Sequence, residues 1–400
     1  MNINPVGIAV PIFFSLMAIE MCTAWWQKKT VYRINDTVAN LGCGIGDQLI
    51  GIFSKLFTVG IYAWVFEHYA LLSLNPQNPW VWAVGFILID FCYYWYHRES
   101  HLVALFWATH SVHHQSEEYN LAVALRQSWF AKFFAWIFYV PLAIIGFSPF
   151  IFVLCYSINL FYQFWIHTKL IDRMGPLEWV FNTPSHHRVH HGTNLIYLDK
   201  NYAGVLIVWD RIFGSFQEEL PYDPPVYGVL APIRSWNPIN TNLVPLKKLF
   251  TRALQAPNAN IFFQTLFQVP GWSYPTAPHP PSKSFGYNQD HKNSHAYTAI
   301  QFACVTISMT LVLTYSEFIA SWFLIPIVLC TILVPITISG YLEHKRWAIP
   351  LEGFRVLTFL ALLIFNPYSA TQTIGMVVAI LGVLAFILVG RSNRIVQNTQ

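Results

Sequence analysis

Histidine is the residue type whose placement in this sequence indicates chemistry. Ten of the fifteen histidines fall between positions 97 and 191, in the segments HRESH, HSVHH, WIHT and HHRVHH. In three of these segments they are three or four residues apart, a spacing that places side chains on one face of a helix. Neutral imidazoles that converge from such faces can bind a metal ion. We therefore predict a metal centre with these histidine ligands: His97, His101, His110, His113, His114, His167, His187, His190 and His191.

The number of these ligands predicts two metal ions. A tetrahedral zinc ion uses four ligands at most, whereas two five- or six-coordinate ions with open positions would use all of these imidazoles. Such a set suits ferrous iron, and zinc or copper could also occupy it. The ExxH pattern of carboxylate-rich di-iron bundles and the HExxH pattern of zinc hydrolases are both absent from the sequence.

Four further residues are predicted to support the ligands. Asp90 lies on the same helix face as His97 and within an apolar stretch, where a carboxylate needs a partner. We expect Asp90 to accept a hydrogen bond from His97 and to orient that ring. His186 is expected to support the ligands or to be a tenth one, and Asn194 and Gln163 are expected to bind metal-held water.

The elements that position these residues are predicted to be membrane helices. Hydrophobic residues make up 55% of the chain and Asp, Glu, Lys and Arg only 10%, against about 25% charged residues in soluble proteins. The mean hydropathy is +0.42. These values exclude disordered, collagen-like and coiled-coil proteins and predict an integral membrane protein. The small net charge of +4 gives no indication of nucleic-acid binding, and six scattered cysteines predict no disulfide framework.

Nine apolar segments are candidates to enter the bilayer, where a full span takes about 20 apolar residues. They are residues 3–25, 45–72, 80–96, 129–146, 149–165, 297–315, 318–340, 354–365 and 371–390. Lys and Arg gather after every second segment, beginning with the first, and the alternate connections contain neither. Since basic residues prefer the cytoplasmic side, we predict an outside N-terminus, four helical hairpins and a cytoplasmic C-terminus, in a bacterial inner membrane or the endoplasmic reticulum. The first segment is expected to remain as an anchor.

Two long polar intervals, residues 97–128 and 167–296, then fall on the cytoplasmic side and are called the cap below. The predicted fold is an all-α, multi-span helical bundle with a cytoplasmic helical cap that carries the histidine-rich two-metal site. Residues 1–296 are expected to form the membrane domain with the histidine motifs and the cap. Residues 297–400 are expected to be plain hydrophobic transmembrane helices without a polar cluster that would form a site.

The histidine motifs resemble those of the fatty acid hydroxylase (sterol desaturase) superfamily of membrane di-iron oxygenases. The superfamily pattern of HxxxH, HxxHH and HxxHH is met by residues 97–101, 110–114 and 187–191. The stretches NTPSHHRVHHG and NYAGVLIVWDRIFGSF are most similar to the ether-lipid subgroup. The resemblance is dense over residues 90–216 and extends more weakly to VYGVLAPI and VPGW.

This resemblance implies a membrane hydroxylase with a non-haem site of two ferrous ions, which uses O2 to hydroxylate a lipid. In the ether-lipid subgroup the carbon next to the ether oxygen of an alkylglycerol is hydroxylated, and the product collapses to a fatty aldehyde and a glycerol derivative. The implied electron donor is tetrahydrobiopterin or a redox protein. Leu102 stands directly after the first motif, where the animal members carry an acidic residue, and the resemblance assigns no pterin-binding residue.

Two other functions fit the same residues. The site could hydroxylate or desaturate a sterol or a fatty-acyl chain, and only product analysis separates these reactions from ether-lipid oxidation. A membrane protein that binds or transports metal would also carry many histidines. The motifs lie at the membrane boundary, however, and Asp90 is the main ionisable residue within the spans, so the pattern favours an enzyme.

Overall fold

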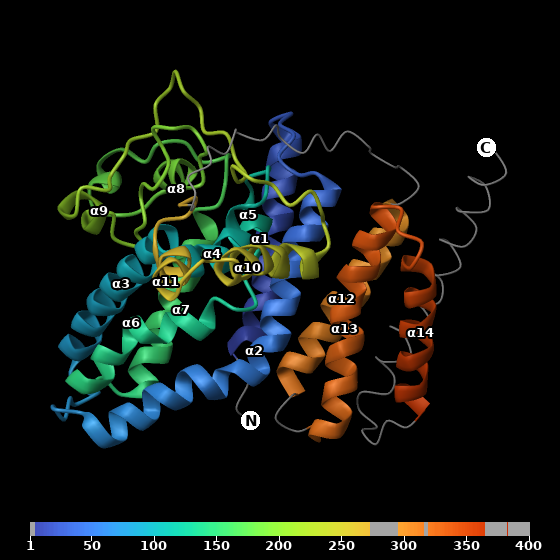
Figure 1. Ribbon diagram of the computed structural model, residues 1–400, viewed down its shortest axis with the longest axis horizontal. Coiled ribbons are helices and arrows are strands. Elements are labelled where there is room, and N and C mark those ends of the chain that lie inside the picture. The colour runs from blue at the N-terminus through green and yellow to red at the C-terminus, as the bar shows by residue number, and fades with distance from the viewer. Residues whose placement is uncertain (1–4, 273–294, 316–318, 365–381, 383–400) are drawn as a thin grey trace.

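The chain is helical in the residues that the structure describes. The computed structural model describes residues 5–272, 295–315, 319–364 and Gly382 (Figure 1). In chain order the helices are α1 (Pro5–Trp26), α2 (Ile34–Tyr69), α3 (Pro79–Leu102), α4 (Ala104–His114), α5 (Leu121–Ala124), α6 (Lys132–Ile145), α7 (Pro149–Trp165), the 3-10 helix η1 (Gly175–Trp179), α8 (Pro184–His190), α9 (Val208–Ile212), α10 (Pro238–Leu254), α11 (Ala259–Phe267), α12 (His295–Tyr315), α13 (Ser321–Leu342) and α14 (Ala348–Ile364). Only isolated bridges, and no strands, occur in these ranges. The predicted all-α fold is confirmed.

The apolar helices confirm a membrane protein. Three stretches are long and apolar enough to cross a bilayer: α2, residues Tyr297–Thr314 of α12, and α13. The predicted segments 129–146 and 149–165 form α6 and α7, whose 14 and 17 residues are fewer than the roughly 20 of a full crossing. Apart from Gly382, the predicted segment 371–390 lies outside the described residues.

Capping residues set the ends of the helices that lead to the histidines. The Asn78 side chain accepts a hydrogen bond from the first turn of α3, and Pro79 takes the first helical position. Gly146 ends α6 with a φ of 119°, in the left-handed region that favours glycine. Ser148 then caps α7, with Pro149 in its first position. The hairpin of α6 and α7 therefore turns at the Ser148-Pro149 break.

The helices α3, α6, α7 and the second half of α2 pack around one apolar core. The ring of Tyr62 on α2 stacks on Phe152 of α7 with centroids 4.2 Å apart. Ile89 of α3, Tyr139 of α6 and Ile151 of α7 are almost completely buried between them. This core fixes the end of α3 that carries the first two histidines.

The cap lies over one end of this core, and Glu20 of α1 ties the two together (Figure 1). The buried Glu20 carboxylate accepts hydrogen bonds from the Thr168 hydroxyl at 2.5 Å, from the Leu121 N–H at 2.9 Å and from the Tyr32 hydroxyl. A helix near the N-terminus thus holds the loops that follow α4 and α7.

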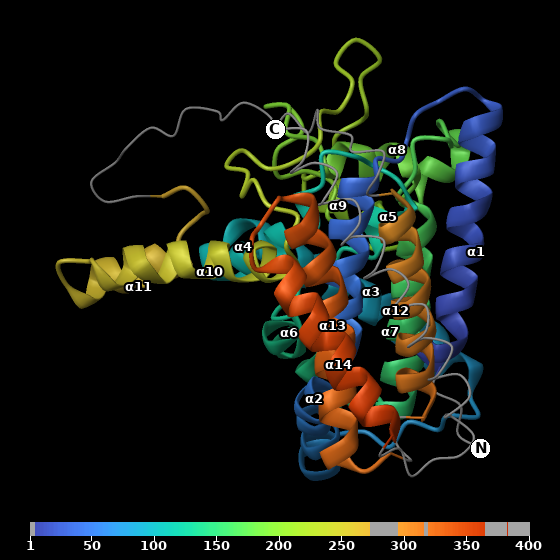
Figure 2. The same ribbon diagram turned by 90° about the vertical axis from the view of Figure 1, so that its right-hand side faces the viewer.

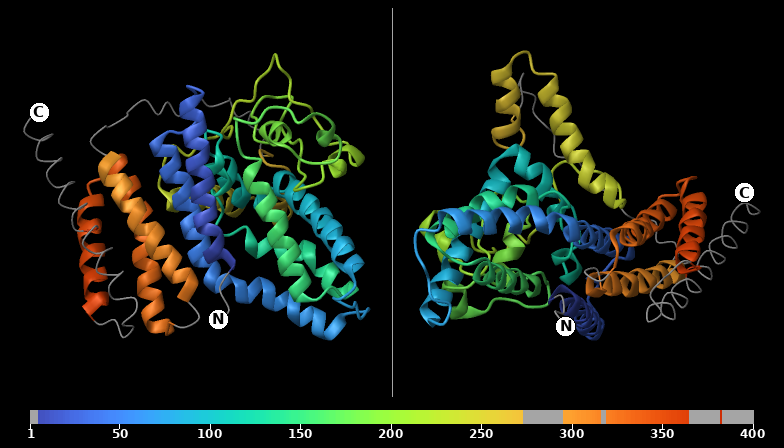
Figure 3. Two further views of the ribbon diagram at one scale, coloured as in Figure 1. Left: turned by 180° about the vertical axis from the view of Figure 1, so that it is seen from behind. Right: turned by 90° about the horizontal axis from the view of Figure 1, so that it is seen from below.

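The helices α12, α13 and α14 stand together beside α2, on the opposite side from α3, α6 and α7 (Figure 3). These expected hydrophobic helices carry a buried polar cluster, which lies outside both groups of potential metal ligands. The buried Arg355 and Glu352 of α14 form an ion pair at 2.6 Å, and the same carboxylate accepts from Gln301 of α12 and from Thr337 of α13 at 2.8 Å. Gln301, Thr337 and the Glu352–Arg355 pair are far apart in sequence, so only the packing of the three helices reveals the cluster.

Candidate metal centre

The predicted ligands come from four places in the chain that the fold brings together. His97 and His101 lie in the last two turns of α3, and the short α4 carries His110, His113 and His114. His167 follows α7 directly. The helix α8 and its C-cap residue carry His187, His190 and His191. Each helix contributes side chains from one or two adjacent faces, because its histidines are spaced by one, three or four residues.

The side chains form two groups whose ligand atoms lie within 4.8 Å of one another in each group. The first group is His97, His101, His110, His114 and His190, and the second is His113, His167, His187 and His191. These are all of the predicted ligands, and no Cys, Asp or Glu of the described residues joins either group. Metal binding by these residues stays a prediction that the geometry supports.

The two groups are adjacent to each other. The rings of His114 in the first group and His191 in the second are stacked, with centroids 4.3 Å apart. Each of these two rings also contacts a ring of its own group. The ring centroids of His113 and His191 in the second group are 4.6 Å apart, and those of His114 and His190 in the first group are 4.8 Å apart. Two ions bound here would therefore share one pocket, as a site for a small molecule such as O2 requires.

Hydrogen bonds to the backbone fix which imidazole nitrogen is free to bind a metal. The Nδ1 atoms of His97, His113, His167 and His190 lie 2.7–3.1 Å from the carbonyl oxygens of Tyr202, Arg126, Gln163 and Lys200. A carbonyl oxygen only accepts, so we assign the proton of each ring to Nδ1. The Nε2 atom then carries a lone pair that points into the site, which is the arrangement of a histidine ligand.

These lone pairs face one another at short distances. The Nε2 atoms of His113 and His167 are 3.2 Å apart, and those of His167 and His187 are 3.0 Å apart. Because His113 and His167 both carry their proton on Nδ1, no proton joins the two Nε2 atoms, and a shared cation satisfies both. Two nitrogens bound to one ion at about 2.1 Å and at right angles lie about 3.0 Å apart, so the residues fit a metal.

Burial keeps the imidazoles in the neutral form that metals bind. Desolvation lowers the pKa of His113 to about 4, and it lowers the pKa of His187, His190 and His191 well below the usual value. Neighbouring histidines lower the pKa further in each case, since two imidazolium charges would repel. The site is therefore neutral at pH 7 and has lone pairs to donate.

Asp90 does not contact His97, and that prediction is wrong. Its buried carboxylate accepts from the Asn159 amide at 2.7 Å, from the N–H groups of Val205 and Leu206 at 2.8 and 3.0 Å, and from the Trp209 indole at 3.0 Å. The loop that follows Tyr202 thus satisfies the carboxylate, while the Tyr202 carbonyl takes the proton of His97. Asp90 holds the segment that orients His97 rather than the ring itself.

The other three supporting residues also have different contacts from those expected. Gln163 contributes its backbone carbonyl to His167, while its side-chain amide donates to Asn159 at 2.7 Å. The side chain of Asn194 bonds to a loop of the cap. It donates a hydrogen bond to the Asp223 carboxylate at 2.5 Å and accepts one from the Val226 N–H at 2.8 Å. His186 lies outside both groups, with its ring against Phe216.

Two buried arginines support the site without having been predicted. The backbone carbonyl of Arg126 accepts a hydrogen bond from His113. Its guanidinium donates to the Val112 carbonyl and to the side-chain oxygens of Asn40 and Gln115, at 2.6–3.1 Å. A lone arginine after an apolar run (ALRQS) was the available signal in the sequence.

Arg188 of α8 pairs with Glu219 at 2.7 Å and donates to the carbonyls of Thr168 and Ile171. It ties α8 to the loop that carries His167. Two of the predicted ligands lie in α8, and a third, His191, is its C-cap residue. The sequence gives no spacing pattern that would predict the partners of either arginine, because these are carbonyls and side chains from distant segments.

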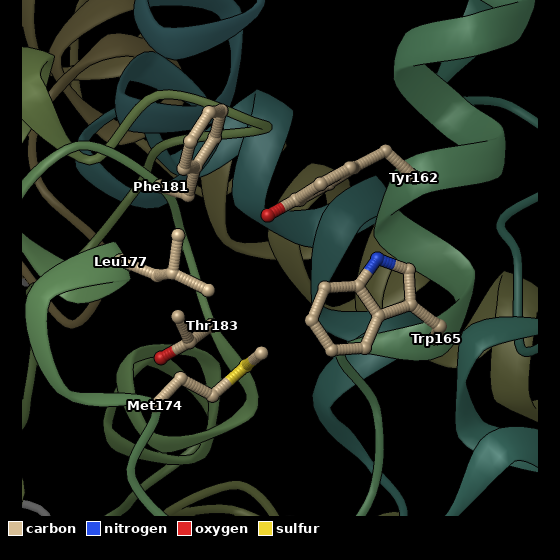
Figure 4. Close-up of a pocket in the computed structure, with 6 residues that line it drawn as sticks. All are labelled: Tyr162, Trp165, Met174, Leu177, Phe181 and Thr183. Carbon is tan, nitrogen blue, oxygen red and sulfur yellow. The ribbon is translucent and has the colours of Figure 1, made fainter.

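An apolar pocket lies next to the second group. Its volume is about 240 Å3, and it is lined by Tyr162, Trp165, Met174, Leu177, Phe181 and Thr183 (Figure 4). Trp165 ends α7 two residues before His167, and Thr183 is the N-cap residue of α8. Two of its apolar lining side chains, Leu177 and Phe181, are exposed.

Comparison with known proteins places this site in a class. The family model for fatty acid hydroxylase matches residues 82–215, the range that contains every histidine of both groups. An ornithine lipid hydroxylase of Rhizobium tropici is 25% identical over 212 residues, which are 52% of this chain and 63% of that protein. No solved structure matches the chain. The fold and the site are therefore those of a membrane hydroxylase.

More similar relatives define the family within this class. Alkylglycerol monooxygenase of Homo sapiens is 37% identical over 375 residues, which are 90% of this chain and 82% of the human protein. The alkylglycerol monooxygenase of Xenopus tropicalis is 36% identical over 371 residues, which are 88% and 81% of the two chains. The chain belongs to the alkylglycerol monooxygenase family. The predicted enzyme class, a monooxygenase, is confirmed by this membership.

Proposed function

We propose that this protein hydroxylates an ether lipid, an alkylglycerol, at the carbon next to the ether oxygen. The observation that carries the proposal is the pair of adjacent histidine groups in a chain of this family. In the proposed reaction one atom of O2 enters the C–H bond, and the other leaves as water with two electrons and two protons from a reductant. The resulting hemiacetal breaks its C–O bond to give a fatty aldehyde and a glycerol derivative.

The two histidine groups would hold two iron ions, and bound iron would supply the activation of O2. The chain contributes the fixed orientation of the rings, because four backbone carbonyls hold Nδ1 protons. It also excludes water, because Val112, Ile166 and Val189 around the histidines are completely buried. We propose tetrahydrobiopterin as the reductant, with a redox protein as the alternative donor.

We propose that the alkyl chain of the substrate lies in the apolar pocket beside the second group. The pocket is lined mainly by apolar side chains, and two of them, Leu177 and Phe181, are exposed, which would favour an alkyl chain over a polar group. A bulkier residue in the pocket should shorten the preferred chain. We expect Leu177→Trp to raise KM for long-chain alkylglycerols several-fold more than for short-chain ones. Leu195→Trp, on an exposed loop, is the matched control, and equal effects on both chain lengths would reject the assignment.

We also propose that the histidine site faces the cytoplasm and that residues 1–296 and 297–400 are separate domains. The basic residues Lys28 and Lys29 follow the end of α1 near the cap, and Lys345 follows the end of α13. The neighbouring Glu343 bonds to Ser235 and Trp236 of the cap, so these charges gather at the end of the molecule that carries the site. This distribution supports a cytoplasmic site.

The test is turnover by purified, iron-loaded protein in lipid nanodiscs. With an alkylglycerol, O2 and tetrahydrobiopterin, we expect release of fatty aldehyde, and loss of that product in the His191→Ala variant. Product from a sterol or an acyl lipid alone would overturn the substrate assignment. No turnover with ether, sterol or acyl lipids, together with metal flux across vesicles, would show that the protein is a metal transporter and not an enzyme.

A further inference from the structure

The hairpin formed by α10 and α11 projects sideways from the rest of the molecule. Figure 2 shows it running crosswise to the membrane helices α12 and α13, with only its base against the bundle. The base contacts α4, α2 and α13, while the tip around residues 254–260 is exposed. A helix pair with no protein neighbour along most of its length needs another partner if it carries apolar side chains.

Two hydrogen bonds fix the height of this hairpin relative to the membrane helices. In α10, the Asn242 side chain accepts from the Trp129 N–H at 2.9 Å, just before α6 begins at Lys132. After α11, the Gln268 carbonyl accepts from the Ala104 N–H at 2.9 Å, where α4 begins. Both bonds lie where apolar helices meet the cap, so the hairpin is held at the predicted level of the bilayer surface.

One face of the hairpin is apolar and exposed. Leu243, Phe250 and Leu254 are spaced by seven and four residues along α10, which places them on one stripe, and Leu254 is 77% exposed. In α11, Phe263 and Phe267 are one turn apart and are 56% and 54% exposed. All five side chains are more than 40% exposed among the described residues.

The rest of α10 is basic. Lys247 and Lys248 are exposed, Arg252 lies one turn further on, and no acidic residue occurs between Pro238 and Trp272. Lys247 borders the apolar stripe, where its long side chain can reach upward to a charged group. Apolar residues on one side and cations on the other are typical of a helix that lies in a membrane interface.

We propose that the α10–α11 hairpin lies in the headgroup layer of the bilayer on the side of the histidine site, and that it binds anionic phospholipids. The apolar stripe contacts the acyl chains, and Lys247, Lys248 and Arg252 contact the headgroups. A second copy of this chain is a poorer partner, because the same face on both copies would bring like charges together. The proposal is independent of the substrate and would hold for any membrane enzyme with this cap.

The test places a fluorophore on single cysteines in protein reconstituted in nanodiscs. The exposed Cys22 is first changed to Ser, since the other cysteines are buried. Labels at Leu254→Cys and Phe263→Cys should be quenched several-fold more by lipids with a nitroxide on the acyl chain than by aqueous iodide. Iodide should quench more strongly than the nitroxide lipids at two control positions. One is Lys248→Cys, about 200° around the helix from Phe250, and the other is Tyr222→Cys on an exposed loop of the cap.

Equal quenching by lipid and iodide at all four positions would overturn the proposal, and so would cross-linking between copies through Leu254→Cys. The headgroup part has its own control. Acyl-chain quenching at Leu254→Cys should rise when phosphatidylglycerol is added to phosphatidylcholine, and Lys247→Gln, Lys248→Gln and Arg252→Gln together should remove that rise. An unchanged rise in this triple variant would reject the binding of anionic headgroups by these cations.

Discussion

His113 and His114 are neighbours in the chain but belong to different histidine groups, and so do His190 and His191. Consecutive residues of a helix point about 100° apart around its axis, so a doubled histidine reaches two positions at once. Each HxxHH motif therefore contributes histidines to both groups, whereas HxxxH in α3 contributes to the first group alone.

The two groups should lose metal separately when one ligand of each is removed. In purified protein with about two irons per chain, His114→Ala is expected to lower the iron content toward one by weakening the first group. His191→Ala is expected to do the same for the second group, and the double variant should retain almost none. The exposed His68→Ala is the matched control and should keep the full content, measured by elemental analysis. An iron content unaffected by both single changes would contradict the ligand assignment.

Asp90 should matter for stability through the loop that it holds. Asp90→Asn replaces one acceptor oxygen by an N–H donor that faces the donors of Val205, Leu206 or Trp209. An unsatisfied buried group costs about 1–3 kcal/mol, so we expect a lower thermal midpoint and weaker iron binding at His97. The exposed Asp172→Asn should change the midpoint little. A wild-type midpoint for Asp90→Asn would show that this carboxylate does not hold the loop.

At the scale of the elements, α2 has two glycines where it closely approaches the segment of residues 125–129. A Cβ at Gly44 would lie 2.2 Å from the Leu125 carbonyl oxygen, and one at Gly46 would lie 2.4 Å from the Trp129 ring. Leu125 precedes Arg126, whose carbonyl orients His113. The approach of α2 therefore sets the position of a segment that supports the second histidine group.

Two glycine substitutions on the same helix test this approach. Gly44→Ala should destabilise the protein by roughly 1–3 kcal/mol, because the backbone of Leu125 must shift. Gly60→Ala meets no atom within 4 Å and should be neutral or stabilising by up to about 1 kcal/mol. Thermal unfolding in detergent, followed by tryptophan fluorescence, measures both. Equal midpoints for the two variants would contradict the close approach at Gly44.

At the scale of the whole molecule, the cluster of Gln301, Thr337, Glu352 and Arg355 joins α12, α13 and α14 into one unit. Charges within a membrane bundle are stable when they are paired and hydrogen-bonded, as Glu352 and Arg355 are. The unit packs on α2 at the side away from the site. None of the four residues of this cluster belongs to either histidine group.

The ion pair in this unit predicts non-additive stability. Removal of one partner leaves a buried charge, so Glu352→Gln or Arg355→Met alone should destabilise the protein by about 3–5 kcal/mol. The double variant should lose clearly less than the sum of the single losses, because no unpaired charge remains. Unfolding midpoints of the four proteins in one detergent complete the cycle. Losses that simply add would show that the two residues act separately.

The histidines that form the two groups and the membrane class were predictable from the sequence because both depend on local patterns. Imidazole is a metal ligand wherever it is, and spacings of three and four put His110, His113 and His114 on one helix whatever surrounds it. Apolar runs predict membrane helices in the same way, since a span needs only length and hydropathy. The count of two ions stays a prediction, which rests on the number of histidines alone.

Only the tertiary structure decided which groups satisfy the buried polar atoms. Asp90 is held by residues more than a hundred positions later, and the ring of His97 is oriented by a backbone carbonyl that every residue type possesses. The polar cluster of α12–α14 and the exposed face of α10 likewise depend on which helices pack together and which do not. Such partners leave no periodic signal in a single sequence, because their separation is set by the path of the chain and not by the repeat of a helix.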